Sequence, residues 1–300
     1  MIAADHLARL LGQPLDRVCQ NGALLAEGLL NARSYYNSDF IIVFSDIAVE
    51  AEALGVLLEF SENRNPHVVS TVDPNDVKVI DMPGAGRIPE LFRAARICRH
   101  ELDKGIPIFS SIKDPFSLAA LLMGSEDFLR SLLEAPEVAR KLIETCCENQ
   151  LRLVDAICSE GFIPMIGAPI ASGSLIGATW FRNFAQQFLA KLFSRVKANG
   201  SFCCMHICGE VGLLEAPLSE LNPDILSFEE WIPSMWENLP NTIPMGYVPT
   251  DLFVKGTEES VQTASLECLT NLPRPFILST ACDIPANSDP RLVCAMMEIN

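Results

Sequence analysis

Short apolar runs alternate with amphipathic stretches along the whole chain. This alternation is typical of β-α repeats around a parallel sheet, whose strands are covered on both faces and are therefore apolar throughout. The pattern predicts seven strands, at residues 40–44, 107–112, 162–166, 202–207, 225–228, 243–247 and 276–280.

Apolar residues recur at helical spacing between these runs. They predict helices at residues 24–33, 88–103, 126–134, 180–197 and 258–271. Ser125 is predicted to cap the third of these helices, because Glu126 and Asp127 follow it and complement the helix dipole. Pro136 is predicted as the first residue of a further helix.

Seven strands are one fewer than a closed (β/α)8 barrel needs. The residues before Phe40 have a helical pattern, apart from a break at Asn21-Gly22. The sequence therefore predicts an α/β fold, a TIM (β/α)8-type barrel that lacks or alters its first strand, as a single domain over residues 1–300. The absence of one strand has two possible explanations. In the first, the incomplete barrel is completed by a second subunit in a homodimer; in the second, the given chain starts downstream of that strand.

Residues 161–181 carry no charge and are long enough to cross a bilayer. They also contain Pro164, Pro169, Gly167, Gly173 and Gly177, which break a helix repeatedly. The segment is therefore predicted to be a buried strand followed by a loop, and we expect no membrane partner.

The formal net charge of −16 excludes nucleic acid as a partner, because binding phosphates requires a basic face. The chain has 11 cysteines, an odd number, and an acidic residue, Asp5, where a secretory signal would carry positive charge. This combination favours a reducing cytoplasm over a disulfide framework. It also suggests an organism with an anaerobic metabolism.

Two residues at the end of one predicted strand have the spacing of metal ligands. His206 and Cys208 point to the same face of an extended strand. Cys282, at the end of the last predicted strand, is the candidate third ligand of a catalytic zinc, which keeps a fourth position open. The alternative is that the cysteines are small buried apolar residues and the histidine is a hydrogen-bonded core group. Cys204 shares the same face but is expected deeper in the strand, as packing.

Several segments, in order along nearly the whole chain, resemble the uroporphyrinogen decarboxylase superfamily. They are Phe44-Ser45-Asp46-Ile47 with residues 49–55, residues 114–119, His206-Ile207-Cys208-Gly209, and Ser279-Thr280-Ala281-Cys282-Asp283-Ile284-Pro285. The last two are similar to the zinc motifs of the superfamily's corrinoid-dependent methyltransferase branch, which includes the methylcobamide:coenzyme M enzymes. The resemblance implies a TIM barrel with Zn2+, and a methyl group exchanged with a cobalamin that a corrinoid protein presents.

The resemblance also directs attention to residues near the expected metal. Asp46 is expected at a strand mouth, where it orients substrate or accepts a proton; the alternative is that it caps the following helix. Glu229 follows the fifth predicted strand and is a candidate catalytic group, or else a solvated loop carboxylate. Tyr247 is expected to line an aromatic substrate pocket that Trp231 and Trp236 flank, unless the tryptophans are core or rim packing.

The chain departs from the superfamily in two informative places. It lacks the arginine-rich first-strand segment with which true decarboxylases bind their substrate's carboxylates, and residues 246–250 replace a Gly-Asn-x-Asp-Pro segment. The first hypothesis is therefore a zinc-dependent methyltransferase that exchanges a methyl group between a corrinoid protein and a small thiol or methylated substrate, in either direction. The alternatives are a uroporphyrinogen decarboxylase-type enzyme and a non-catalytic truncated relative that binds a corrinoid protein.

Overall fold

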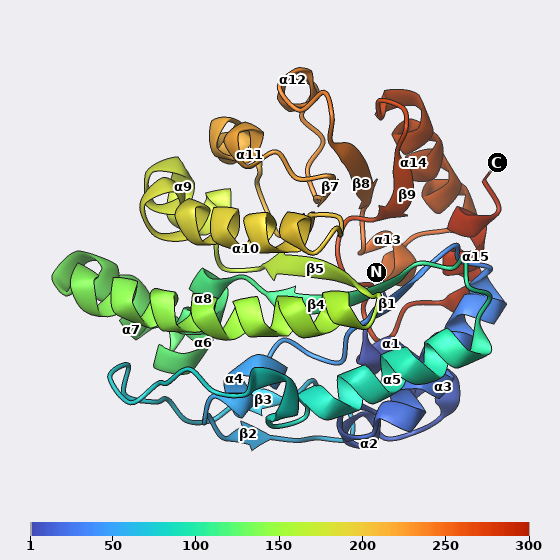
Figure 1. Ribbon diagram of the computed structural model, residues 1–300. Helices are drawn as coiled ribbons and strands as arrows, with labels where there is room; N and C mark the ends of the chain where they lie inside the picture. The colour runs from blue at the N-terminus through green and yellow to red at the C-terminus, as the bar shows by residue number, and fades with distance from the viewer. Residues whose placement is uncertain (1, 300) are drawn as a thin grey trace.

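The computed structural model describes residues 2–299 and contains a curled sheet of seven parallel strands (Figure 1). All seven predicted strands are confirmed, with ends shifted by one or two residues. In sheet order they are β1 (Ile41–Val43), β4 (Ile108–Lys113), β5 (Ile163–Ala168), β6 (Cys204–Ile207), β7 (Ile225–Ser227), β8 (Ile243–Val248) and β9 (Ile277–Thr280).

The sheet has a core on each face. A large apolar core lies between the strands and the helices that cover their outer side (Figure 1). A smaller core lies inside the curl, built from Ala3 and from strand residues such as Ile42, Phe109, Met165 and Met245. Burial on both faces explains why these strands are apolar runs rather than alternating patterns.

The sheet does not close into a complete barrel. Within residues 2–299, β1 pairs with β4 alone and β9 pairs with β8 alone, so the sheet is open between β9 and β1. The residues before β1 form three helices instead: α1 (Ala4–Leu11), α2 (Leu15–Gln20) and α3 (Gly22–Tyr36). The prediction of a barrel without its first strand is confirmed.

The predicted helices are also present, as α3, α5 (Ile88–Glu101), α7 (Ser125–Glu134), α8 (Pro136–Ser159) and α14 (Glu258–Asn271). Pro136 occupies the first turn of α8, as predicted. The cap prediction for Ser125 is wrong, because Ser125 is already helical and Gly124 is the N-cap. Gly124 links α6 (Pro115–Met123) to α7 at φ 87°, a conformation that glycine adopts without strain.

Two predictions around residue 180 need correction. The loop predicted after β5 spans only residues 169–172, because α9 (Gly173–Trp180) follows at once. The single predicted helix at residues 180–197 is a π-helix, η2 (Phe181–Gln186), followed by α10 (Gln187–Ala198). Gly177, with φ 63°, breaks the regular geometry of α9 without ending the helical run.

The remaining elements lie around the carboxyl ends and the outside of the sheet. A hairpin of β2 (Leu58–Glu59) and β3 (His67–Val68) follows α4 (Val49–Ala53). The others are η1 (Met82–Gly84), η3 (Gly212–Leu214), α11 (Glu215–Leu221), α12 (Pro233–Glu237), α13 (Leu252–Lys255) and α15 (Pro290–Met297). Within residues 2–299, no helix combines the length and apolarity that crossing a membrane requires.

Candidate metal centre

Four side chains from three strand ends converge on one point. His206 is in β6, Cys208 directly follows that strand, Glu229 follows β7, and Cys282 follows β9. One ligand atom from each, two sulfurs, a ring nitrogen and a carboxylate oxygen, lies within 4.8 Å of all the others. We call these four residues the metal-type group. Its position matches the rule that parallel barrels carry their chemistry at the carboxyl ends of strands.

The histidine is at the centre of the group. Its Nε2 atom lies 3.3 Å from Cys208 Sγ and 3.5 Å from Cys282 Sγ. Its Nδ1 atom is 3.0 Å from Ser227 Oγ. With a cation bound to Nε2, the ring proton would lie on Nδ1 and be donated to the serine. Ser227 has this position because it pairs with His206 in the β6–β7 register.

A hydrogen bond joins the two thiols. It lowers the pKa of Cys282 and raises the pKa of Cys208, so Cys282 is the more acidic of the two and Cys208 is the donor. His206 also stabilises the Cys282 thiolate. A divalent cation placed between the two sulfurs would replace the proton of this hydrogen bond and leave both sulfurs ionised. The donor set of two sulfurs, one imidazole and one carboxylate is the chemistry that zinc accepts.

Cys204 behaves as expected for packing. It lies in the inner core, buried between neighbouring strands, and burial raises the pKa of its thiol. The contrast with Cys282 shows that position at the strand end, rather than residue type, distinguishes the two kinds of cysteine.

Asp46 is occupied by a different interaction. Its carboxylate accepts hydrogen bonds of 2.6 Å and 3.1 Å from the Arg87 guanidinium, and one of 3.0 Å each from Ser45 Oγ and the Ala48 backbone. Arg87 also donates to Glu52 at 2.6 Å. Asp46 therefore anchors the turn before α4 and is not part of the metal-type group. Its catalytic role remains a prediction.

Tyr247 packs with the aromatic residues that the sequence placed near it. Its ring stacks on Trp231 at 5.7 Å between centroids and 4° between planes, and Trp231 also stacks on Trp236. Its hydroxyl accepts a 3.0 Å hydrogen bond from Asn271 at the end of α14. Tyr247 is thus part of an aromatic cluster packed toward α14, and its substrate-binding role remains a prediction.

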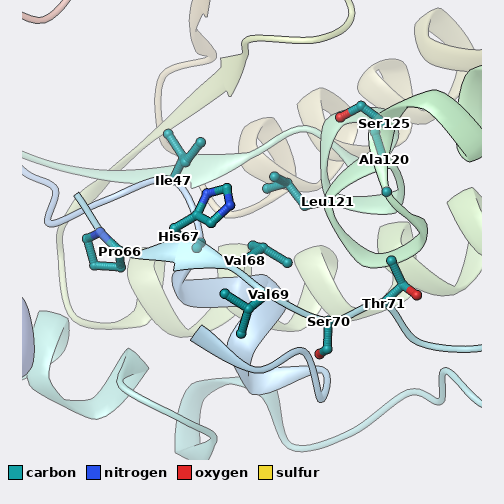
Figure 2. A pocket seen from close by; sticks show the side chains of 12 residues that line it. Ile47, Pro66, His67, Val68, Val69, Ser70, Thr71, Ala120, Leu121 and Ser125 are labelled. Atoms are coloured by element: carbon teal, nitrogen blue, oxygen red, sulfur yellow. The ribbon is translucent and has the colours of Figure 1, made fainter. Parts of the chain in front are cut away.

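A cavity of about 850 Å³ lies apart from the metal-type group, against the β2–β3 hairpin. Figure 2 shows the ring of His67 close to Ile47 and Leu121 on its wall. None of the four metal-type residues lines this cavity. It adjoins the turn that Asp46 anchors, through Ile47 and Ala48.

Sequence reasoning missed Ser227 and Arg87. The serine is identified only by the register of β7 against β6, and the arginine only by the tertiary contact that joins α5 to the end of β1. Neither pairing leaves a signal in the spacing of residues along one chain.

The fold and the site together define a class of protein: an open α/β barrel with His, Cys and Glu side chains at its strand ends that could hold a metal ion. Comparison with known proteins narrows that class. The chain belongs to the uroporphyrinogen decarboxylase (URO-D) family, which matches residues 2–300.

Similar curated proteins in this family carry out two chemistries. The chain is 29% identical over 249 residues to a methylated-thiol–coenzyme M methyltransferase of Methanosarcina mazei, covering 80% of this chain and 66% of that protein. It is 26% identical over 192 residues to the methylcobamide:CoM methyltransferase MtaA of Methanosarcina barkeri, covering 62% and 56%. It is 28% identical over 205 residues to a uroporphyrinogen decarboxylase of Myxococcus xanthus, covering 61% and 54%.

The fold has a solved counterpart. A methyltransferase from Methanosarcina mazei superimposes with a TM-score of 0.89 at 21% identity, over 99% of this chain and 89% of that one. The alignments to the first two curated relatives span only 56% and 66% of their lengths. The comparisons therefore establish the fold and the family, and show that enzymes of both chemistries are related to this chain.

Proposed function

We propose that this protein is a zinc-dependent methyltransferase that exchanges a methyl group between a corrinoid protein and a small thiol or methylated substrate. The observation that carries the proposal is the convergence of His206, Cys208, Cys282 and Glu229 within 4.8 Å. The methylcobamide and thiol chemistry named for the similar Methanosarcina proteins supports the substrate class.

Each residue of the group has a separate task in this proposal. His206 presents Nε2 and is held in orientation by Ser227. Cys208 and Cys282 supply the two sulfurs and lose the proton of the hydrogen bond that joins them when a cation binds. Zinc bound there supplies positive charge that favours the ionised form of a substrate thiol, or polarises the atom that carries a methyl group.

Glu229 has two tasks that follow one another. Without substrate its carboxylate completes the four-atom set. If a substrate thiol took that fourth position, the Glu229 carboxylate beside it would be the candidate acceptor of its proton. Its oxygen lies within 4.8 Å of the other ligand atoms, so it would move closer to reach the hydrogen-bond distance of about 3 Å that proton transfer requires.

The remaining parts of the proposal concern context. The cysteines of the described residues form no disulfide, and a reducing cytoplasm and an anaerobic metabolism are part of the proposal. The net charge of −16 suits a corrinoid protein with a basic docking face. A homodimer remains part of the proposal, since a second subunit is one way to support an incomplete barrel.

Metal analysis of the purified protein tests the first half of the proposal. We expect about one zinc per chain, lost in His206→Ala and retained in Cys158→Ala, which removes a cysteine outside the group. If the parent protein contained clearly less than about one zinc per chain and His206→Ala contained the same amount, zinc binding at the metal-type group would be contradicted.

A methyl-transfer assay tests the second half. Methylcobalamin is incubated with a panel of thiols, and cob(I)alamin with methylated thiols and methyl ethers, while the cobalamin spectrum is followed. We expect turnover in at least one direction, abolished in Cys282→Ser. Zinc binding without turnover would favour the non-catalytic relative. Turnover of uroporphyrinogen would favour the decarboxylase, although Arg87 is already paired with Asp46 and Glu52.

A further inference from the structure

A buried lysine lies in the same row of the sheet as the histidine of the metal-type group. Lys113, the last residue of β4, pairs with Gly167 of β5, and Gly167 pairs with His206 of β6. Neighbouring strands lie about 4.8 Å apart, so the backbones at Lys113 and His206 are separated by roughly 10 Å. The two side chains therefore belong to one layer at the carboxyl end of the sheet.

The side chains of this row point into the curl of the sheet. Phe109, four residues before Lys113, and Cys204, two residues before His206, both belong to the inner core. Residues two or four apart on a strand share a face, so Lys113 and His206 also face the interior. They do so from the strands on either side of β5.

Gly167 leaves the interior open between these two side chains. A Cβ atom built on Gly167 would have one neighbour within 4 Å among the described residues, apart from those adjacent in the chain. That neighbour is the Ile112 carbonyl oxygen at 3.7 Å, an ordinary van der Waals contact. The row is therefore free at Gly167 for a small ligand that extends from Lys113 toward His206.

The Lys113 ammonium has no anionic partner in the described part of the chain. The residue is 3% exposed, and its Nζ atom lies 4.8 Å from the centroid of the Phe44 ring. The ion pairs of residues 2–299 do not include it. Two neighbouring carboxylates bind backbone amides instead: Glu50 accepts 2.8 Å from the Lys113 N–H, and Asp114 caps α6. A buried charge is costly without a counter-charge, so an anion is favoured here.

We propose that Lys113 binds the anionic end of a short substrate thiol, or of its methylated form, whose sulfur lies at the metal-type group; this assignment rests on the proposed function of that group. The carbon chain lies over Gly167, and a carboxylate or sulfonate accepts hydrogen bonds from Lys113 Nζ. Lysine carries a compact charge on a flexible four-carbon stem, so Nζ can move from Phe44 toward the ligand. Lys113 thereby selects an anionic thiol over a neutral one of the same length.

Thiols of one chain length and different charge test the proposal. Zinc-loaded protein is titrated calorimetrically with 3-mercaptopropanoate, 3-mercaptopropanesulfonate, 3-mercaptopropan-1-ol and 3-aminopropanethiol. We expect at least one anionic thiol to bind about tenfold or more tightly than the alcohol, a ratio that corresponds to about 1.4 kcal/mol, and the amine to bind most weakly. The two anions show which head group fits. Equal affinities for the anions and the alcohol would overturn the proposal and leave zinc–thiol binding intact.

Three variants assign the charge selectivity to this row. Lys113→Met should remove the preference for the anionic thiols and leave the affinity for the alcohol unchanged. Lys191→Met is the matched control, because Lys191 also lies over a phenylalanine ring, at 5.2 Å, but is exposed on α10. Gly167→Ala should weaken all of these thiols, because its methyl group occupies the open space in the row. An unchanged preference in Lys113→Met would refute the assignment.

Anions without a thiol separate this assignment from the proposed function. Metal-free protein is titrated with ethanesulfonate and propanoate, and binding is followed by NMR chemical shifts. We expect saturable binding that Lys113→Met loses and Lys191→Met keeps. If the protein holds no zinc, the proposed function fails and this titration alone decides: binding that depends on Lys113 supports the anion site, and its absence overturns it.

Discussion

Replacing Asp46 with asparagine tests whether this residue is structural or catalytic. The substitution keeps the shape of the side chain and removes its charge. Asp46 is buried, with its side chain 0% exposed, and Arg87 beside it is 9% exposed. The structure therefore predicts that Asp46→Asn lowers the free energy of unfolding and leaves the zinc content unchanged, since Asp46 is not in the metal-type group.

The magnitude follows from the contacts that change. Removing one partner of a buried ion pair costs roughly 3–5 kcal/mol, because the other charge remains buried. Arg87 keeps its 2.6 Å interaction with Glu52, so we expect the lower end of that range, about 3 kcal/mol. The hydrogen bond from the Ala48 backbone is retained by the asparagine oxygen.

Denaturant unfolding followed by circular dichroism measures the effect, with the exposed Asp103→Asn as a matched control. The double variant with Arg87→Met should lose less than the sum of the single losses, because the two residues contact each other. If Asp46→Asn had the same free energy of unfolding as the parent protein but had lost methyl transfer, this reasoning would be refuted and the catalytic prediction supported.

Three further predictions address the site and its surroundings. Zinc binding at pH 7 should release about one proton, from Cys208, and weaken as the pH falls, as measured by calorimetry in buffers of different ionisation enthalpy. Ser227→Ala should weaken zinc binding by roughly 10–100-fold in a chelator competition. Burial raises the pKa of Asp114 to about 6, so its protonated form favours folding and that stability is lost as the pH rises through 6. Asp114→Asn should therefore gain about 3 kcal/mol relative to the parent between pH 3 and pH 8 in denaturant unfolding, and a pH-independent difference would contradict the shift.

The strands were predictable because a parallel strand covered on both faces has no polar positions to interrupt it. The bounds of α14 were predicted correctly at residues 258–271, and the structure shows a capping box between Thr257 and Ser260 at its start. The break at residue 180 was not, because the π-helical turn of η2 depends on packing rather than on local sequence. The same holds for Gly124, whose role as a cap depends on the backbone angle that α6 and α7 impose.

The sequence predicted which site residues lie at strand ends, but not which side chains contact one another. His206 and Cys208 could be assigned to one face from their spacing, and Cys282 and Glu229 from their positions after strands. The sequence left open whether Asp46 belonged with them. Its position at a strand mouth fitted a role near the metal and a helix cap equally well. Its partner Arg87, the N-cap of α5, is brought to the end of β1 only by the fold.

The missing strand and the metal-type group are related through the order of the sheet. The four residues come from β6, β7 and β9, which lie within one continuous run of paired strands. The gap falls on the other side of β9, so it does not separate any of these residues from the others. Strand β1, which leads to Asp46, lies across the gap from β9. Continuous backbone pairing from β6 to β9 therefore supports the geometry of the metal-type group independently of the opening between β9 and β1.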